Sequence, residues 1–106
     1  MTRVIITDRA DADSVEIIRD LTGKAGVLVA DRYEADFDAI YRRLETFPES
    51  GSPRPKLGRF IRIGVVLPYV VVYRYVPDDD LVAIIRILHG RRRITRRMLN
   101  PSTTPP

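Results

Sequence analysis

Few side chains in this sequence combine into a catalytic or metal site. His89 is the only histidine and there is no cysteine, so thiolate chemistry and the clustered ligands of a zinc site are excluded. A serine triad lacks a second candidate base. Asp78, Asp79 and Asp80 are consecutive, but they separate two apolar runs, where a solvated turn is a simpler interpretation than a cation site. The sequence therefore predicts no catalytic residue, no metal and no cofactor.

Arginine is the residue type that clusters. Residues 91–97 contain no lysine, and three interpretations of this basic segment are open: a solvated frayed tail, a surface that neutralises nucleic-acid phosphates, or a contact with an acidic protein surface. No helix-turn-helix or zinc-finger motif accompanies it, which argues against sequence-specific DNA binding. The planar guanidinium group binds carboxylates bidentately, so the exclusive use of arginine favours recognition. The arginines are Arg91, Arg92, Arg93, Arg96 and Arg97.

Charge is distributed unevenly along a chain of single-domain length. The 106 residues carry a net charge of +4, yet residues 1–53 hold seven basic and eleven acidic side chains, whereas residues 54–106 hold eleven basic and three acidic ones. No acid follows Asp80. We expect one domain over residues 1–99 and a disordered tail over 100–106, whose sequence NPSTTPP offers no apolar anchor.

Two apolar runs predict the elements that position these side chains. Tyr69–Val76 and Val82–His89 are rich in Val, Ile and Tyr, contain no internal Gly or Pro, and flank a Pro-Asp-Asp-Asp turn, which predicts a β-hairpin. Neither run is long enough to span a membrane, and no signal peptide is visible, so we expect a cytoplasmic protein.

Strict alternation assigns the two faces of this hairpin. The face expected to join the core contains Tyr69, Val71, Tyr73, Tyr75, Ala83, Ile85 and Ile87. The opposite face is too apolar for plain solvent exposure and carries two arginines, so it is expected to be half-covered, either by a partner or by the chain's own loops. Its members are Val70, Val72, Arg74, Val76, Val82, Ile84, Arg86 and Leu88.

The first half of the sequence predicts a strand and two antiparallel helices. Arg3–Thr7 is a short β-branched run. Asp8 is expected to cap a first helix that ends near Thr22, with Gly23 as its C-cap. The second helix carries an apolar stripe of Tyr33, Phe37, Ile40, Tyr41 and Leu44 and ends at Phe47.

A loop over residues 48–58, with three prolines and two glycines, leads to a further strand at Arg59–Ile63. The predicted fold class is α+β, with an N-terminal strand and a two-helix antiparallel hairpin packed on a small curved antiparallel sheet.

At this point several motifs carry a family resemblance. FPESGSPRPKLG, an Arg in the following strand (Arg62), PYVVVYRY and IIRILHGRR occur in this order. Together they resemble the ParE branch of the ParE/RelE toxin superfamily, from Val4 to about Arg93. The resemblance implies a toxin of a type II toxin-antitoxin pair that inhibits DNA gyrase and is neutralised by a ParD-like antitoxin. Operator DNA would be bound only indirectly, through the antitoxin.

The resemblance also suggests which residues touch each partner. We expect the target to be contacted by the basic segment and the strand end before it, which are His89, Arg91, Arg92, Arg93, Arg96 and Arg97. We expect the antitoxin to cover the arginine-bearing face of the sheet, at Arg62, Val72, Arg74, Ile84 and Arg86. His89 itself is interpreted as a residue that caps the strand rather than as a catalyst.

The alternative function on the same fold is a ribosome-dependent mRNA endonuclease of the RelE type, because fold alone does not define function. Such nucleases resemble this chain in their basic residues, but they typically place a Tyr or His near the C-terminus for proton transfer. Residues 90–106 contain neither. No general base with a pKa near neutrality is evident either, so the non-enzymatic toxin is the preferred prediction.

Overall fold

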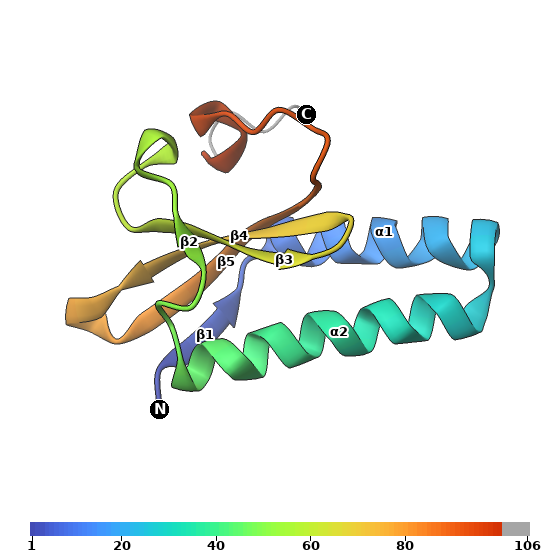
Figure 1. Cartoon of the computed structure of the whole chain (residues 1–106), viewed down its shortest axis with the longest axis horizontal. Helices are drawn as coiled ribbons and strands as arrows, with labels where there is room; N and C mark the ends of the chain where they lie inside the picture. The colour runs from blue at the N-terminus through green and yellow to red at the C-terminus, as the bar shows by residue number, and fades with distance from the viewer. Residues whose placement is uncertain (101–106) are drawn as a thin grey trace.

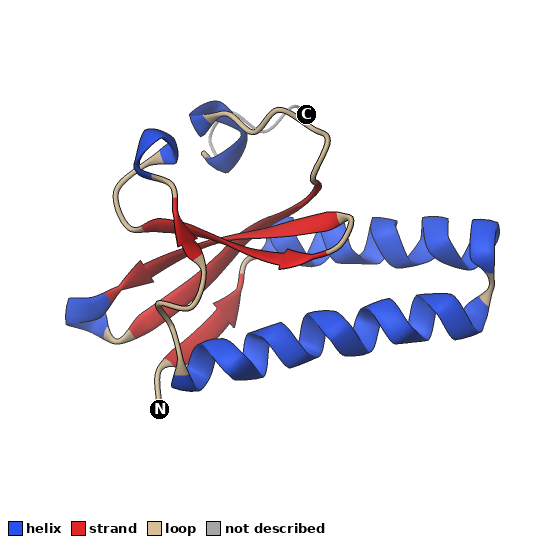
Figure 2. Ribbon diagram, viewed as in Figure 1, coloured by secondary structure: helices blue, strands red, loops and turns tan. Residues whose placement is uncertain are grey.

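The computed structural model describes residues 1–100, in which two long helices cover one face of a five-stranded sheet (Figures 1 and 2). The predicted tail therefore lies outside the described residues except for Asn100. The α+β class is confirmed. The elements in chain order are β1 (Arg3–Ile6), α1 (Asp8–Ala25), α2 (Val27–Thr46), β2 (Ser52–Pro53), β3 (Ile61–Val66), β4 (Tyr69–Val76) and β5 (Leu81–His89), with short 3₁₀ helices at Pro55–Leu57, Pro77–Asp79 and Arg96–Leu99.

The sheet is mixed rather than purely antiparallel. Its strand order is β1-β5-β4-β3-β2, and all neighbours are antiparallel except β1, which pairs with β5 in parallel from Arg3 opposite Leu81 to Ile6 opposite Ile84. The prediction of an antiparallel sheet is wrong at this edge. The direction of β1 depends on where the helical hairpin returns the chain to the sheet, and the short run RVII carries no signal for that.

Both predicted caps of the first helix are displaced. The N-cap is Thr7 rather than Asp8, because the Thr7 hydroxyl oxygen accepts a hydrogen bond from the Ala10 amide at 3.2 Å. The helix also continues through Gly23 to Ala25 and ends at Gly26, whose φ of 92° is in the region that favours glycine. Gly26 ends α1 and begins α2, so the two helices form a tight antiparallel hairpin.

The predicted apolar stripe of the second helix is confirmed. Phe37, Ile40 and Leu44 are buried against the sheet, and Tyr33 and Tyr41 pack beside them. The helix ends at Thr46, close to the predicted Phe47, but it begins at Val27, well before the stripe.

The β4–β5 hairpin forms as predicted, although β5 begins one residue early, at Leu81. The predicted faces hold along β4 but not along the first part of β5. Val72 pairs with Arg86, whereas Tyr73 pairs with Ile84, so Ile85 is an extra residue in a β-bulge. Before the bulge the alternation of β5 is inverted. Val82 and Ile84 face the helices and Ile85 faces away, opposite to the prediction, because one inserted residue exchanges the faces.

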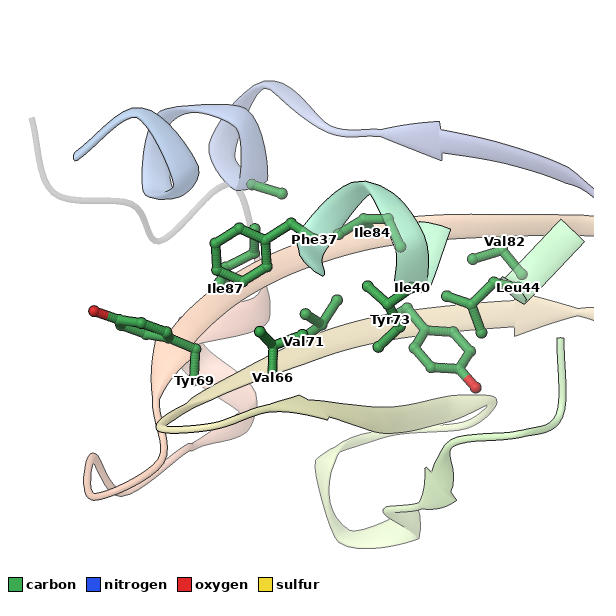
Figure 3. Close-up of a cluster of buried hydrophobic side chains, with 11 residues drawn as sticks. Phe37, Ile40, Leu44, Val66, Tyr69, Val71, Tyr73, Val82, Ile84 and Ile87 are labelled. Atoms are coloured by element: carbon green, nitrogen blue, oxygen red, sulfur yellow. The ribbon is translucent and has the colours of Figure 1, made fainter. Parts of the chain in front are cut away.

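The main core lies between the helices and the sheet (Figure 3). α2 supplies Phe37, Ile40 and Leu44, which pack onto side chains of the central strands. The buried strand residues are Val66, Tyr69, Val71, Tyr73, Val82, Ile84 and Ile87, and Ala10 of α1 completes the cluster.

The face of the sheet away from the helices, which we call the far face, is covered by the chain itself. Leu99 is buried on it, and Ile94, Met98 and Leu57 pack at its border. The strand residues beneath are Ile61, Ile63, Val72, Ile85 and Leu88. Of the two predicted covers for this face, the structure shows the chain's own segments in place.

The predicted loop over residues 48–58 holds more structure than expected. β2 (Ser52–Pro53) pairs with β3, and a 3₁₀ helix follows at Pro55–Leu57. The next strand begins at Ile61 rather than Arg59, because Arg59 and Phe60 form a turn.

Candidate functional site

The basic segment leaves the sheet through a defined turn at the end of β5. The Gly90 amide donates to the Pro68 carbonyl at 2.7 Å, and the Arg92 amide donates to the His89 carbonyl at 2.9 Å. The His89 Nδ1 atom accepts from the Arg91 amide at 3.1 Å, and its ring meets Tyr69 edge-on at 5.8 Å between centroids. His89 therefore shapes the turn at the strand end.

Arg91, Arg92 and Arg93 are exposed on a loop that is anchored at both ends. β5 fixes the start of the loop, and after it the 3₁₀ helix Arg96–Leu99 returns to the sheet, where Leu99 is buried. The interpretation of a frayed tail is therefore wrong for this segment. The six predicted target-contact residues lie at the end of β5, on this loop and in the 3₁₀ helix that follows it. Their role stays a prediction.

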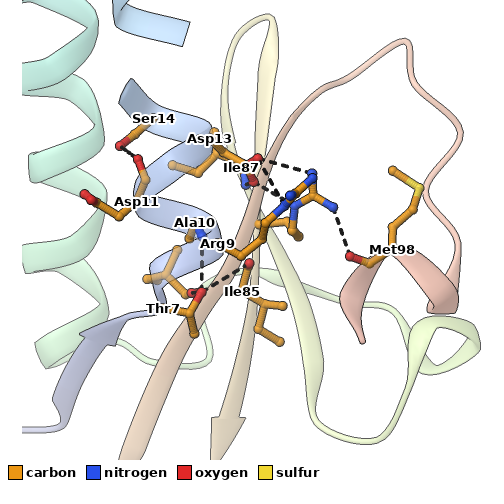
Figure 4. Close-up of polar contacts among 11 residues, drawn as sticks. Thr7, Arg9, Ala10, Asp11, Asp13, Ser14, Ile85, Ile87 and Met98 are labelled. Atoms are coloured by element: carbon orange, nitrogen blue, oxygen red, sulfur yellow. Dashed lines mark hydrogen bonds and ion pairs between the residues drawn. The ribbon is translucent and has the colours of Figure 1, made fainter. Parts of the chain in front are cut away.

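Arg86 is a structural residue rather than part of an open surface. Its two partners, Asp13 of α1 and the Met98 carbonyl, are labelled in Figure 4. Its side chain is buried and forms a bidentate ion pair with Asp13 of α1, from Nε to Oδ2 at 2.7 Å and from Nη2 to Oδ1 at 3.2 Å. Its Nη1 atom donates to the Met98 carbonyl at 3.0 Å. Asp13 Oδ2 also accepts from the Ile87 amide at 3.0 Å. We call Arg86, Asp13 and the Met98 carbonyl the arginine clip. It joins α1, β5 and the C-terminal segment, residues 94–99.

Asp13 is the residue of this clip that the sequence interpretation missed. It lies three residues after the buried Ala10 and four before Ile17, on the stripe of α1 that packs onto the core. A carboxylate on such a stripe is rarely buried without a cationic partner. That position was the signal that could have identified it, and it also indicated a buried arginine elsewhere.

The five residues predicted to contact an antitoxin do not form one exposed surface. Arg74 is exposed, and Arg62 is half-buried with its Nη1 atom bound to two carbonyls of the loop 49–51 at 2.8 and 2.9 Å. Val72 is fully buried on the far face, and Ile84 lies on the helix side of the sheet. The predicted face is therefore wrong for Ile84, while contacts at Arg62 and Arg74 stay predictions.

Three tyrosines are held in their neutral form. Burial and the neighbouring carboxylates of Asp38 and Asp11 raise the pKa of Tyr41 to about 12. Burial also raises the pKa of Tyr69 and of Tyr73. The Tyr73 hydroxyl is in a fixed structural role, because it donates to the Pro48 carbonyl at 2.8 Å and accepts from the Gly51 amide at 2.9 Å. None of these three is suited to accept a proton near neutral pH.

The acidic turn is a structural turn as well. Pro77–Asp79 form a 3₁₀ helix, and the Asp80 carboxylate accepts from the Thr2 hydroxyl at 2.7 Å. Within the part of the chain that the structure describes, no three His, Cys, Asp or Glu side chains gather into a metal-binding group. No helix among residues 1–100 is both long and apolar enough to cross a membrane.

Comparison with known proteins gives one family match and two similar proteins. The family described as "ParE toxin of type II toxin-antitoxin system, parDE" matches residues 4–94. Toxin ParE3 of Caulobacter vibrioides is 34% identical over 98 residues, which cover 92% of this chain and 96% of that protein. Toxin RelE2 of the same organism is 37% identical over 92 residues, which cover 87% and 99% of the two chains.

A solved structure shares the fold. It is described as "Chromosomal ParDE TA system from P. aeruginosa" and superposes with a TM-score of 0.70 over 84% of this chain and 96% of the other. The sequence identity is 21%, so this likeness concerns the fold alone. The mixed sheet with a helical hairpin on one face is thus an arrangement found in a second protein.

Proposed function

Because this chain belongs to the ParE family of toxins from type II toxin-antitoxin systems, we propose that it inhibits DNA gyrase and that a ParD-like antitoxin neutralises it. Inhibition would be non-enzymatic and would take place in the cytoplasm. Antitoxin binding would also bring the toxin to operator DNA indirectly. The observation that carries the proposal is the loop of Arg91, Arg92 and Arg93, which is exposed and anchored on both sides.

The geometry of this loop supports a protein contact. Anchoring by β5 and by Leu99 reduces the conformational freedom that the arginines lose when a partner binds. Guanidinium groups presented in a fixed place can form bidentate bonds to carboxylates on a partner. A stoichiometric inhibitor needs such a recognition surface and no catalytic base.

Growth arrest and gyrase inhibition by the full chain test the proposal. Neutralising the loop with Arg91→Gln, Arg92→Gln and Arg93→Gln should weaken inhibition of gyrase supercoiling at least about tenfold, because removing one partner of a hydrogen-bonded charge pair buried at an interface costs about 2 to 5 kcal/mol. The matched control removes the same charge from α2 with Arg32→Gln, Arg42→Gln and Arg43→Gln, and it should inhibit like the parent. A folded loop variant with full toxicity would place the effector surface elsewhere.

A ribonuclease of the RelE type is the second candidate, since one similar protein carries the name Toxin RelE2. Two arginines of the sheet and the absence of Tyr and His from residues 90–106 disfavour it. Arg86 forms a buried ion pair with Asp13, and Arg62 donates hydrogen bonds to backbone carbonyls, so neither is free to stabilise a cleavage transition state. We therefore expect messenger RNA on translating ribosomes to stay intact when the toxin is added. Cleavage in the ribosomal A site would reverse this choice.

For the antitoxin we propose contacts at Arg62 and Arg74, the accessible members of the predicted set. An antitoxin could reach Val72 only by displacing Leu99 and Met98 from the far face of the sheet. Co-purification with an antitoxin encoded by the neighbouring gene tests this: Arg74→Glu should weaken the complex, whereas Arg42→Glu on α2 should not. Equal binding by both variants would remove Arg74 from the interface.

A further inference from the structure

A second group of arginines shares a groove with an exposed phenylalanine on the side of the sheet away from the helices. Arg59, Arg74 and Arg96 come from a turn, from β4 and from the C-terminal 3₁₀ helix, and they line one groove of about 490 Å³. No Asp or Glu lines this groove. Within residues 1–100 the three guanidinium groups make no hydrogen bond or ion pair. The other lining residues are Leu57, Gly58, Phe60, Leu99 and Asn100.

Phe60 is held in an unusual backbone conformation at the edge of this groove. It is the third residue of a turn closed by the bond from the Ile61 amide to the Gly58 carbonyl, and its φ is 68°, a value that glycine adopts far more readily. The residue is 39% exposed, and the Arg59 guanidinium carbon lies 4.7 Å from the ring centre. Backbone strain that displays an aromatic ring to solvent points to a function of the ring.

The backbone on both sides of the groove is held by hydrogen bonds and buried contacts. The Phe60 carbonyl accepts from the Tyr75 amide at 3.0 Å, which fixes the turn beside β4. Arg96 begins a 3₁₀ helix that is anchored by buried Leu99 and by the arginine clip, where Arg86 binds the Met98 carbonyl. The backbone therefore needs no ordering before the three arginines can act together on a ligand.

We propose that this groove binds a single strand of nucleic acid, DNA or RNA. Phosphates lie on Arg59, Arg74 and Arg96, and one unpaired base stacks on the ring of Phe60 or on the Arg59 guanidinium beside it. An acidic protein segment would satisfy the three charges but would give no role to the exposed ring, which is why a strand with bases is favoured. A base inside a duplex is not available to the ring.

This binding goes beyond the proposed function, because it needs no gyrase and uses other arginines than the loop at 91–93. It is binding without cleavage, since the groove is lined by no His, Asp or Glu that could act as a base.

Fluorescence anisotropy with the full chain and oligonucleotides of about 12 nucleotides, one of dT and one of U, tests the proposal. Joint replacement by Arg59→Gln, Arg74→Gln and Arg96→Gln should weaken binding at least about tenfold and reduce its salt dependence. Phe60→Gly should weaken binding about fivefold or more through lost stacking. Glycine suits the positive φ, so this variant should fold, which thermal unfolding checks.

Two controls make the result decisive. Arg32→Gln, Arg42→Gln and Arg43→Gln remove the same charge from α2 and should leave the affinity unchanged. A duplex of the same length and a polyglutamate peptide should bind at least about tenfold more weakly than the single strand. Equal loss in the α2 control, normal binding by Phe60→Gly, or preference for the duplex or the peptide would each overturn the proposal.

Discussion

The two faces of the sheet are stabilised in different ways. The helix face is covered by α1 and α2, whose apolar stripes pack onto the central strands and bury a continuous cluster. The far face is covered by a 3₁₀ helix at Pro55–Leu57 and by the C-terminal segment, in which Leu99 is the one buried side chain among the described residues. The C-terminal segment is therefore held on the far face by few apolar contacts. The arginine clip adds hydrogen bonds that hold it in place.

The clip connects the two faces. Arg86 lies in β5, Asp13 belongs to a helix on one side, and the Met98 carbonyl belongs to the segment on the other. A buried ion pair is no strong stabiliser in itself, but removal of one partner leaves an uncompensated buried charge. We therefore expect a substitution in the arginine clip to destabilise both faces of the sheet. A substitution of an apolar side chain should destabilise mainly the face on which that side chain is buried.

The largest effect is expected for Asp13→Ala. The side chains of Arg86 and Asp13 are 6% and 10% exposed, so the variant would leave a buried guanidinium unpaired and lower the free energy of unfolding by about 3 to 5 kcal/mol. Urea unfolding measures this. The control is Asp20→Ala, which breaks the exposed pair with Lys24 at 3.1 Å on the same helix and should cost less than about 1 kcal/mol.

A double variant sharpens this test. Replacing both partners with apolar residues, Asp13→Leu with Arg86→Met, should recover much of the lost stability, because no charge is left buried. If Asp13→Ala and Asp20→Ala proved equally mild, the clip would not hold the two faces together.

A smaller effect is expected from two adjacent isoleucines that the bulge places on opposite faces of the sheet. Ile84 is 0% exposed beneath the helices and Ile85 is 8% exposed beneath the C-terminal segment. Truncation to alanine should cost about 4 kcal/mol at Ile84 and about 2 kcal/mol at Ile85, because the short C-terminal segment can settle into the space more easily. Thermal unfolding of both variants measures the difference.

Limited proteolysis shows which face each truncation loosens. Ile85→Ala should speed tryptic cleavage at Arg91, Arg92 and Arg93, whereas Ile84→Ala should not do so before the whole domain unfolds. The reverse order would mean that the bulge does not separate the two faces.

The smallest effect concerns pH. The pKa of Tyr41 is raised from 10 to about 12, so folding favours its neutral form. The stability linked to this group is complete below about pH 10 and is lost as the pH rises through the folded pKa. Between about pH 10 and 12, the Tyr41→Phe variant should lose less stability than the parent. Near neutral pH the stabilities of the two proteins should change with pH in the same way. Thermal unfolding across that range checks it, and parallel curves would contradict it.

The same titration distinguishes the faces. Tyr41, Tyr69 and Tyr73, whose pKa values are all raised, belong to the helix-face cluster. Alkaline pH should therefore loosen the helix face before the far face.

Local patterns predicted the elements well, and long-range pairing decided the rest. The ends of β4 and β5 follow from turn residues and β-branched runs, and the stripe of α2 follows from helical periodicity. The bulge at Ile85 left no such signal, because both faces of β5 are apolar and either register would bury isoleucine. The alternation likewise placed Arg86 on a half-covered surface, because nothing near it in the sequence indicated a buried carboxylate partner. Its partner lies 73 positions away in the sequence.

The parallel pairing of β1 with β5 has a consequence for how this toxin is made. β5 is the only sheet neighbour of β1 within residues 1–100, so β1 can join the sheet only after β5 has been synthesised. Leu99, which closes the far face, follows later still. Domains generally fold as units during synthesis, and here the unit is complete only after β5 and the segment that ends at Leu99 have been made. Chains that stop before β5 should therefore cause no growth arrest.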